Sequence, residues 1–94
     1  MSISYKYTFT NKILTAAHKK SRNNYNEIIL SKTCACFCCQ KIFTPDKVVH
    51  WIKEKDGLST ACCDCGIDAV IGSKSRYPIN KTFLSDMHHL WFLA

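Results

Sequence analysis

Residues 36–39 read Cys-Phe-Cys-Cys and residues 62–65 read Cys-Cys-Asp-Cys, and these two stretches decide the fold. Each contains a Cys-x2-Cys pair, and 22 residues separate the pairs. Two residues between ligands let one tight turn present both sulfurs to the same ion, and two such turns are typical of a tetrahedral zinc site. The sequence therefore predicts one zinc ion with four ligands: Cys36, Cys39, Cys62 and Cys65.

The predicted zinc ion has a structural role. Four thiolates leave zinc no open coordination position, which is the property of structural rather than catalytic sites. A chain of 94 residues buries only a thin core and needs a further source of stability. Because the unfolded chain has no preformed site, metal binding contributes folding free energy. Buried or redox-active thiols, or an iron–sulfur cluster in the same four positions, are the alternatives.

Three of the seven cysteines, Cys34, Cys38 and Cys63, fall outside the two pairs. Since a tetrahedral site needs four ligands, we expect these three to be bystanders. A reactive thiol would need a positive charge beside it, and Lys41 is near in sequence. The odd cysteine count and the lack of a signal-peptide pattern at the start favour a cytoplasmic protein with reduced thiols. No apolar run approaches the roughly 20 residues of a membrane helix.

The positive charge is concentrated near the N-terminus. The formal net charge is +6, and six of the 13 lysines and arginines lie in residues 1–33 against one acid, Glu27. An apolar stripe of Ile13, Leu14 and Ala17 predicts a helix from about residue 11 to Ser21. The cations of this segment form either a solvated face or a face that contacts phosphates; they are Lys12, Lys19, Lys20 and Arg22.

The remaining patterns predict a small α+β domain. Residues 3–9 alternate like a strand, with a frayed terminus as the alternative, and a second short helix covers 25–31. Thr44-Pro45-Asp46 has the residue types of a helix start, which predicts a helix that ends at Asp56-Gly57. Its expected buried face is Val48, Val49, Trp51 and Ile52. Residues 58–61 suggest a short strand, residues 66–72 are ambiguous, and a last helix starts near Asn80 with its apolar residues at helical spacing.

These elements make one domain, 1–94, in three parts. Residues 1–33 are the basic helical part, 34–72 the metal core, and 73–94 a loop followed by the C-terminal helix. We expect a treble-clef or zinc-ribbon-like centre, stabilised by zinc, with the N- and C-terminal helices packed around it.

Several motifs resemble a family of small bacterial and phage cytoplasmic proteins that are labelled as uncharacterised or zinc-binding. The similar stretches lie between about residues 15 and 92: Cys36 to Pro45, Trp51, Cys62-x2-Cys65-Gly-Ile-Asp-Ala-Val-Ile-Gly, Tyr77-Pro-Ile and Met87-His-x2-Trp-Phe. The resemblance implies a recurring polar set made of His18, Ser21, Asp68 and His88. This chain departs from the family at Cys38 and Cys63, where aromatic residues or proline are expected.

Three functions are compatible with these patterns. The first is a binding or regulatory module that contacts nucleic acid or a protein partner through the basic N-terminal helix. The second is a hydrolase or nuclease-like enzyme, which requires His18, Asp68 and His88 to meet in a cleft. The third is an inhibitor of a partner protein that uses an exposed aromatic patch. A closed four-thiolate site supports the scaffold in all three and does not choose between them.

Overall fold

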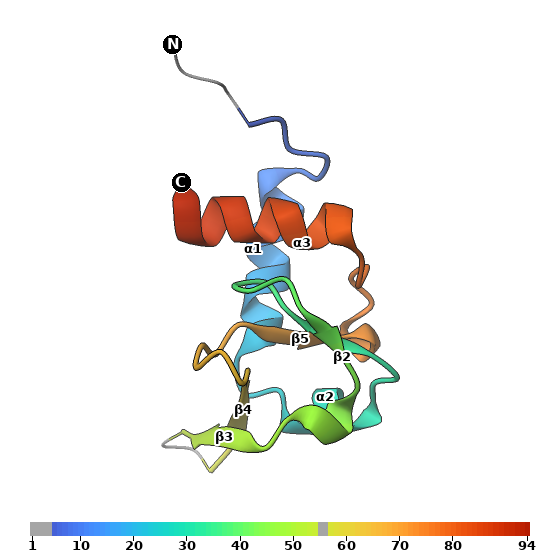
Figure 1. The fold of residues 1–94 in the computed structure, drawn as a ribbon, viewed down its shortest axis with the longest axis vertical. Helices are drawn as coiled ribbons and strands as arrows, with labels where there is room; N and C mark the ends of the chain where they lie inside the picture. Colours follow the sequence, from blue (N-terminus) through green and yellow to red (C-terminus); the bar gives the residue numbers. More distant parts are fainter. Residues whose placement is uncertain (1–4, 55–56) are drawn as a thin grey trace.

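The computed structural model describes residues 5–54 and 57–94, and this part of the chain is a small α+β fold (Figure 1). The α-helices are α1 (Asn11–His18), α2 (Tyr25–Leu30) and α3 (Lys81–His88). The strands are β1 (Cys34–Cys36), β2 (Ile42–Phe43), β3 (His50–Lys53), β4 (Ser59–Cys62) and β5 (Val70–Gly72). Short 3-10 helices are η1 (Lys19–Ser21), η2 (Pro45–Lys47) and η3 (Ser73–Ser75), and a π-helix, η4 (His89–Leu93), follows α3. The coarse fold class is as predicted.

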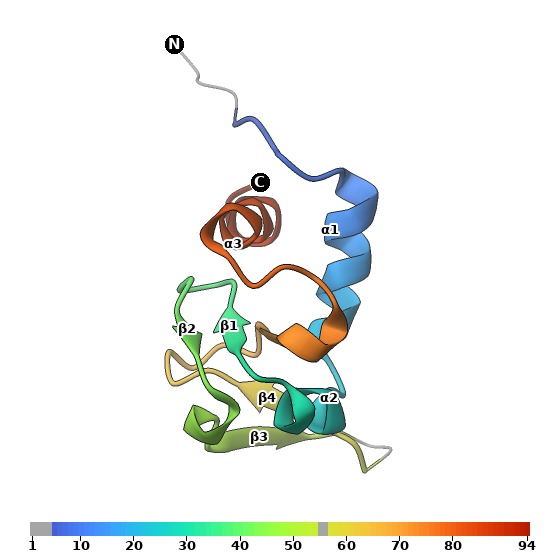
Figure 2. The ribbon, with the colours of Figure 1, turned by 90° about the vertical axis from the view of Figure 1, so that its right-hand side faces the viewer.

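The N-terminal helix forms where its sequence predicts it. Thr10 caps α1, because its side chain accepts a hydrogen bond from the Ile13 N–H. Leu14 and Ala17 are buried, and the chain continues as η1 to Ser21. In Figure 2, α1 stands upright beside the body of the domain, and α3 is seen end-on. The predicted helix from residue 11 to Ser21 is therefore confirmed, with a tighter last turn.

The strands form two antiparallel sheets. One has the order β2-β1-β5, and the other pairs β3 with β4. Asn24, which is 4% exposed, connects them. Its Nδ2 donates to the Val70 carbonyl of β5 at 2.8 Å, and its Oδ1 accepts from the Ala61 N–H of β4 at 3.0 Å. One buried amide thereby satisfies backbone groups from both sheets.

The prediction of a helix after Thr44 is wrong. Pro45–Lys47 makes one 3-10 turn, and the chain then enters β3 at His50. The β-branched and aromatic side chains that follow the turn favour extended backbone, and they pair with β4, where Trp51 lies opposite Ala61. Val49, expected inside, is 70% exposed. Of the predicted end at Asp56-Gly57, Asp56 lies outside the described residues.

The strand predicted over 3–9 is not found in its described part, residues 5–9. Residues 3 and 4 lie outside the described part. Residues 5–9 instead lie against α3, where the nearly fully buried carboxylate of Asp86 accepts three hydrogen bonds. The donors are the Tyr5 hydroxyl at 2.7 Å and the backbone N–H groups of Thr8 and Phe9, both at 2.8 Å. The terminal segment is thus held by side-chain chemistry rather than by a sheet.

The C-terminal helix begins one residue after Asn80, whose side chain accepts from the Phe83 N–H. Helical spacing places Phe83, Leu84 and Met87 on the buried side of α3, and α3 contacts α1. The largest fully buried side chains of the core are Phe37, Phe83, Leu14, Ile28, Ile71, Leu84 and Met87. Within the described residues, no helix has the length and apolar character needed to cross a membrane.

Candidate metal centre

The first cysteine turn follows β1 directly. The Gln40 N–H donates to the Cys36 carbonyl at 2.7 Å, and the Cys36 N–H donates to the Lys41 carbonyl at 3.0 Å. Gln40 has a φ of 63°, a left-handed conformation in which glycine is more usual. The backbone N–H groups of Cys38 and Cys39 point at the Cys36 sulfur. The turn therefore brings its cysteine sulfurs to one side and directs backbone N–H donors at one of them, the Cys36 sulfur. Such donors stabilise a thiolate that binds a metal ion.

The second turn follows β4 and is one residue shorter. The Gly66 N–H donates to the Cys63 carbonyl at 2.9 Å, and the Cys63 N–H donates to the Ile67 carbonyl at 2.9 Å. Gly66 has a φ of 94°, so this position requires glycine. The Ile67 N–H points at the Cys65 sulfur. The hydrogen-bonded turn thus begins at Cys63, and its two cysteines, Cys63 and Cys65, have the spacing Cys-x-Cys.

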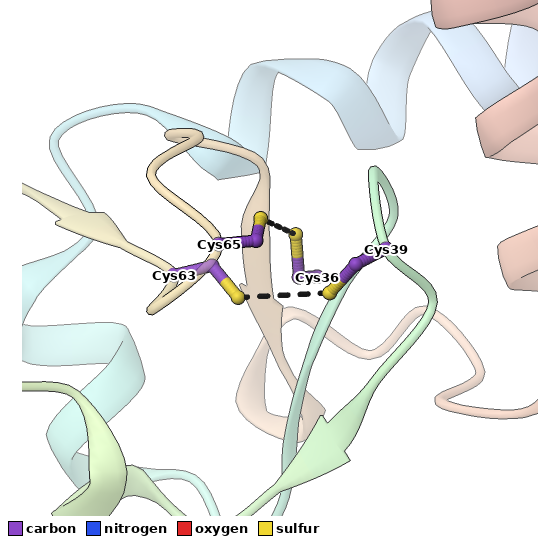
Figure 3. Close-up of side chains that lie close together, drawn as sticks. All are labelled: Cys36, Cys39, Cys63 and Cys65. Atoms are coloured by element: carbon purple, nitrogen blue, oxygen red, sulfur yellow. Dashed lines mark hydrogen bonds between the residues drawn. The ribbon is translucent and has the colours of Figure 1, made fainter.

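The two turns bring four thiols together, which we call the four-cysteine cluster: Cys36, Cys39, Cys63 and Cys65. Their sulfur atoms all lie within 4.8 Å of one another. Cys36 and Cys65 are 3.8 Å apart and Cys39 and Cys63 are 3.7 Å apart (Figure 3). A tetrahedron with zinc–sulfur bonds of about 2.3 Å has sulfurs roughly 3.8 Å apart, and these two separations match that distance. These four thiols could hold a metal ion.

The protonation of the cluster is uneven. Burial opposes ionisation of Cys65, but donors from Ile67 and the neighbouring thiols outweigh it and lower its pKa. Burial raises the pKa of Cys63 to about 12 and also raises that of Cys36. Without a cation, burial therefore opposes ionisation of Cys36 and Cys63, whereas Cys65 ionises more readily than an ordinary thiol. A divalent ion at the centre supplies the charge that lets all four ionise.

Lys41 and Asp64 join the outer sides of the two turns. The Lys41 Nζ lies 3.1 Å from a carboxylate oxygen of Asp64, which lowers the pKa of Asp64 and raises that of Lys41. Four thiolates and a divalent ion carry a net charge of about −2, so a lysine beside them is favourable. Because both side chains are exposed, this ion pair adds orientation more than stability.

The structure differs from the sequence prediction at one ligand. Cys63, expected to be a bystander, lies in the cluster, and Cys62, expected to be a ligand, does not. Cys62 is the last residue of β4 and pairs with His50. Successive residues of a strand point to opposite faces, so Cys62 and Cys63 cannot both face the first turn. Cys62 lines, together with Cys63, Phe43 and Val48, an open cavity of about 560 Å³.

The other two cysteines have distinct places. The Cys38 thiol is partly exposed and hydrogen-bonds the sulfur of Cys65, which makes it a neighbour of the cluster. Cys34 is fully buried in β1 between its partners Phe43 and Gly72. Burial raises the pKa of the Cys34 thiol to about 11. Cys34 is therefore a core residue.

The three residues of the enzyme hypothesis are only partly brought together. His18 is exposed, and its ring centroid lies 4.1 Å from that of Trp91 and 5.9 Å from that of Phe37 in the first cysteine turn. His88 Nδ1 lies 3.1 Å from the Phe37 carbonyl. Both histidines therefore lie near the first cysteine turn, whereas Asp68 is exposed and lies near Cys62. In residues 5–54 and 57–94, no hydrogen bond or ion pair joins any two of these three residues.

The basic residues of the first helix face solvent. Lys12, Lys19 and Lys20 are exposed and have no carboxylate partner in the described part of the chain. Arg22 lies 3.5 Å from Glu54 with 72% of its side chain exposed, a pair that contributes little and is easily exchanged. The segment therefore presents cations that internal contacts do not use.

Comparisons with models of protein families, with curated proteins and with solved structures found no match. The arguments for function therefore rest on the site and the surfaces of this chain. The sequence carried one unused signal for the ligand set, the symmetric order Cys-x-Cys-Cys followed by Cys-Cys-x-Cys, which allows either of two ligands at the second turn.

Proposed function

We propose that this protein is a zinc-stabilised binding module that contacts nucleic acid through its basic N-terminal helix. The observation that carries the proposal is the set of exposed lysines on α1 and η1 that lack carboxylate partners among the described residues. Lys12 and Lys19 are seven positions apart, nearly two helical turns or about 10 Å, and so lie on similar faces of the helix. Such a row suits the regular charge of a phosphate backbone.

The metal has a structural part in this function. Four thiols around one position leave no open site for a reactant. The cluster joins the turn after β1 to the turn after β4 and thereby holds the two sheets in place. The sulfur spacing is compatible with zinc, the ion that four tetrahedral thiolates typically hold in structural sites.

Aromatic side chains lie close to the lysines. His18 directly precedes Lys19, and its exposed ring packs on the partly exposed Trp91. Phe92, next in the sequence, is 41% exposed. Bases of a single strand stack on such rings, which adds sequence-tolerant affinity to the phosphate contacts.

A salt series tests the proposal. Fluorescence anisotropy would compare the zinc-loaded protein on labelled duplex DNA and on a labelled single-stranded RNA of the same length. We expect affinity to fall steeply with salt on at least one of them. K19E/K20E should weaken binding by at least roughly tenfold and lower the salt slope by about one per lysine.

The matched control K47E/K53E makes the same charge change on η2 and β3 and should bind more tightly than K19E/K20E. Binding that is absent, or independent of salt, refutes the proposal.

A further inference from the structure

The end of α2 and the start of η3 are held together by two serine hydroxyls. Ser31 Oγ accepts from the Lys74 N–H at 2.9 Å, and Ser73 Oγ accepts from the Lys32 N–H at 3.0 Å. Gly72 permits this approach, because a Cβ there would lie 2.2 Å from Ser31 Oγ. We call residues 31–32 and 73–76 the serine corner. Its backbone is therefore fixed by contacts from two distant parts of the chain.

The serine corner carries three cations. Lys32, Lys74 and Arg76 are all exposed. None of them forms an ion pair with any residue in the described part of the chain. Three unpaired cations on a rigid backbone form a positive surface that internal contacts do not neutralise.

Arg76 also has a strained backbone. It follows η3 with φ 72° and ψ 5°, the left-handed region in which glycine or asparagine is usual. Two other non-glycine residues, Asn23 and Gln40, have positive φ. Asparagine tolerates this conformation, and the Gln40 side chain accepts a hydrogen bond from Ser85 of α3 at 3.2 Å. The Arg76 side chain has no such partner among residues 5–54 and 57–94.

The contacts within the described part of the chain do not explain an arginine in a position that favours glycine. Backbone strain persists where the side chain has a task, and observed strain therefore motivates a search for one. The guanidinium fork binds phosphate oxygens in a bidentate manner, and it is always charged. A fixed backbone reduces the entropy lost when the side chain is ordered on a ligand.

We propose that the serine corner is a second phosphate-contacting surface, in which Arg76 binds a backbone phosphate of a nucleic acid and Lys32 and Lys74 contact its neighbours. This inference rests on the proposed function and extends its interface. In both views η3, drawn in orange, lies at the height of the lower end of α1, where Lys19 and Lys20 follow (Figures 1 and 2). A bound strand that follows the basic helix can therefore reach the corner.

Arg76→Gly separates the binding role from the fold. Glycine relieves the positive φ, so the urea midpoint of the zinc-loaded variant should equal or exceed that of the wild type. Its affinity for the labelled DNA or RNA of the salt series should fall at least roughly threefold, and the salt slope should fall by about one. Arg76→Lys keeps the charge and the strain, and should recover part of the affinity.

A matched control isolates the charge that Arg76→Gly removes. Lys53→Gln removes one exposed positive charge from β3 and should weaken binding less than Arg76→Gly. If the wild type binds and K19E/K20E weakens it, but Arg76→Gly equals Lys53→Gln in affinity and slope, the serine corner is not part of the interface and the proposed function stands. If the wild type binds neither probe, both proposals fall.

Discussion

The sulfur atoms of Cys39 and Cys63 lie 3.7 Å apart, although the residues are 24 positions apart in the sequence. Cys63, rather than its neighbour Cys62, thereby completes the four-cysteine cluster with Cys36 and Cys65. The choice between two adjacent cysteines follows from the second turn, which closes on the Cys63 carbonyl. Because only one of the two adjacent cysteines lies in the cluster, substituting each in turn tests the metal site directly.

Serine substitutions distinguish the two candidate ligands. Cys63→Ser removes a thiolate from the cluster and should weaken zinc binding by roughly 100-fold or more, because a bound ion would lose a quarter of its ligands. Cys62→Ser should retain affinity within a few-fold. Competition with a chromophoric chelator measures both constants, and native mass spectrometry gives the number of ions per chain. The opposite ranking would show that the paired Cys-x2-Cys spacing operates at the second turn.

The side-chain amide of Asn24 should contribute measurably to the free energy of unfolding. Asn24→Ala removes the partners of the Ala61 N–H and the Val70 carbonyl. Because unpaired buried groups each lose the hydrogen bond and gain no water, unfolding free energy should fall by about 2–4 kcal/mol. Urea denaturation of the zinc-loaded protein measures this change. Asn26 is exposed on α2, and Asn26→Ala should change stability by less than about 0.5 kcal/mol.

The buried thiol of Cys34 predicts sensitivity to alkali. Its pKa is raised by burial from the ordinary value of 9.0 to about 11. A group with a raised folded-state pKa contributes its full stability below the ordinary pKa and loses it as pH rises through the folded value. Between about pH 9 and pH 11, this one group lowers the unfolding free energy by about 1.4 kcal/mol per pH unit. Cys34→Ala should show a shallower decline than the wild type over the same range in urea titrations; equal slopes would contradict the assignment.

The hydroxyl of Tyr5 reports on the N-terminal segment. Burial first, and then the hydrogen bond to Asp86 and its charge, raise the pKa of Tyr5 to about 12. Asp86→Asn removes the charge, so the pKa should move toward the ordinary value near 10. Carbon NMR of the labelled tyrosine ring follows the titration, and Tyr5→Phe identifies the signal. Asp86→Asn should also speed hydrogen exchange at the Thr8 and Phe9 amides, which donate to the Asp86 carboxylate. Unchanged exchange would mean that other contacts hold the segment.

Much of the architecture follows from local patterns. The apolar stripe around Leu14 and the cap at Asn80 predict the first and last helices, because both signals act within a few residues. The metal turns are predictable for the same reason. The helix expected after Thr44 failed because the capping signal competes with the β-branched residues beyond it, and pairing with β4 decides in favour of the strand.

Other features depend on contacts that a single sequence does not encode visibly. The choice of Cys63 depends on which way a strand end faces, and a one-residue difference reverses it. The sequence does not reveal that Asn24 connects the two sheets, because an asparagine before a short helix also occurs as an ordinary helix cap. Its role appears only when both sheets are in place around it.

The two sheets are joined both by Asn24 and by the four-cysteine cluster, and these connections differ in permanence. Asn24 is part of every copy of the chain, whereas the four thiols would form a strong connection only in copies that bind a metal ion. Copies made under metal scarcity would keep one connection and lose the other, and their cysteine turns would be open to cleavage by proteases. The abundance of the protein would then follow the metal supply of the cell, without any dedicated sensor.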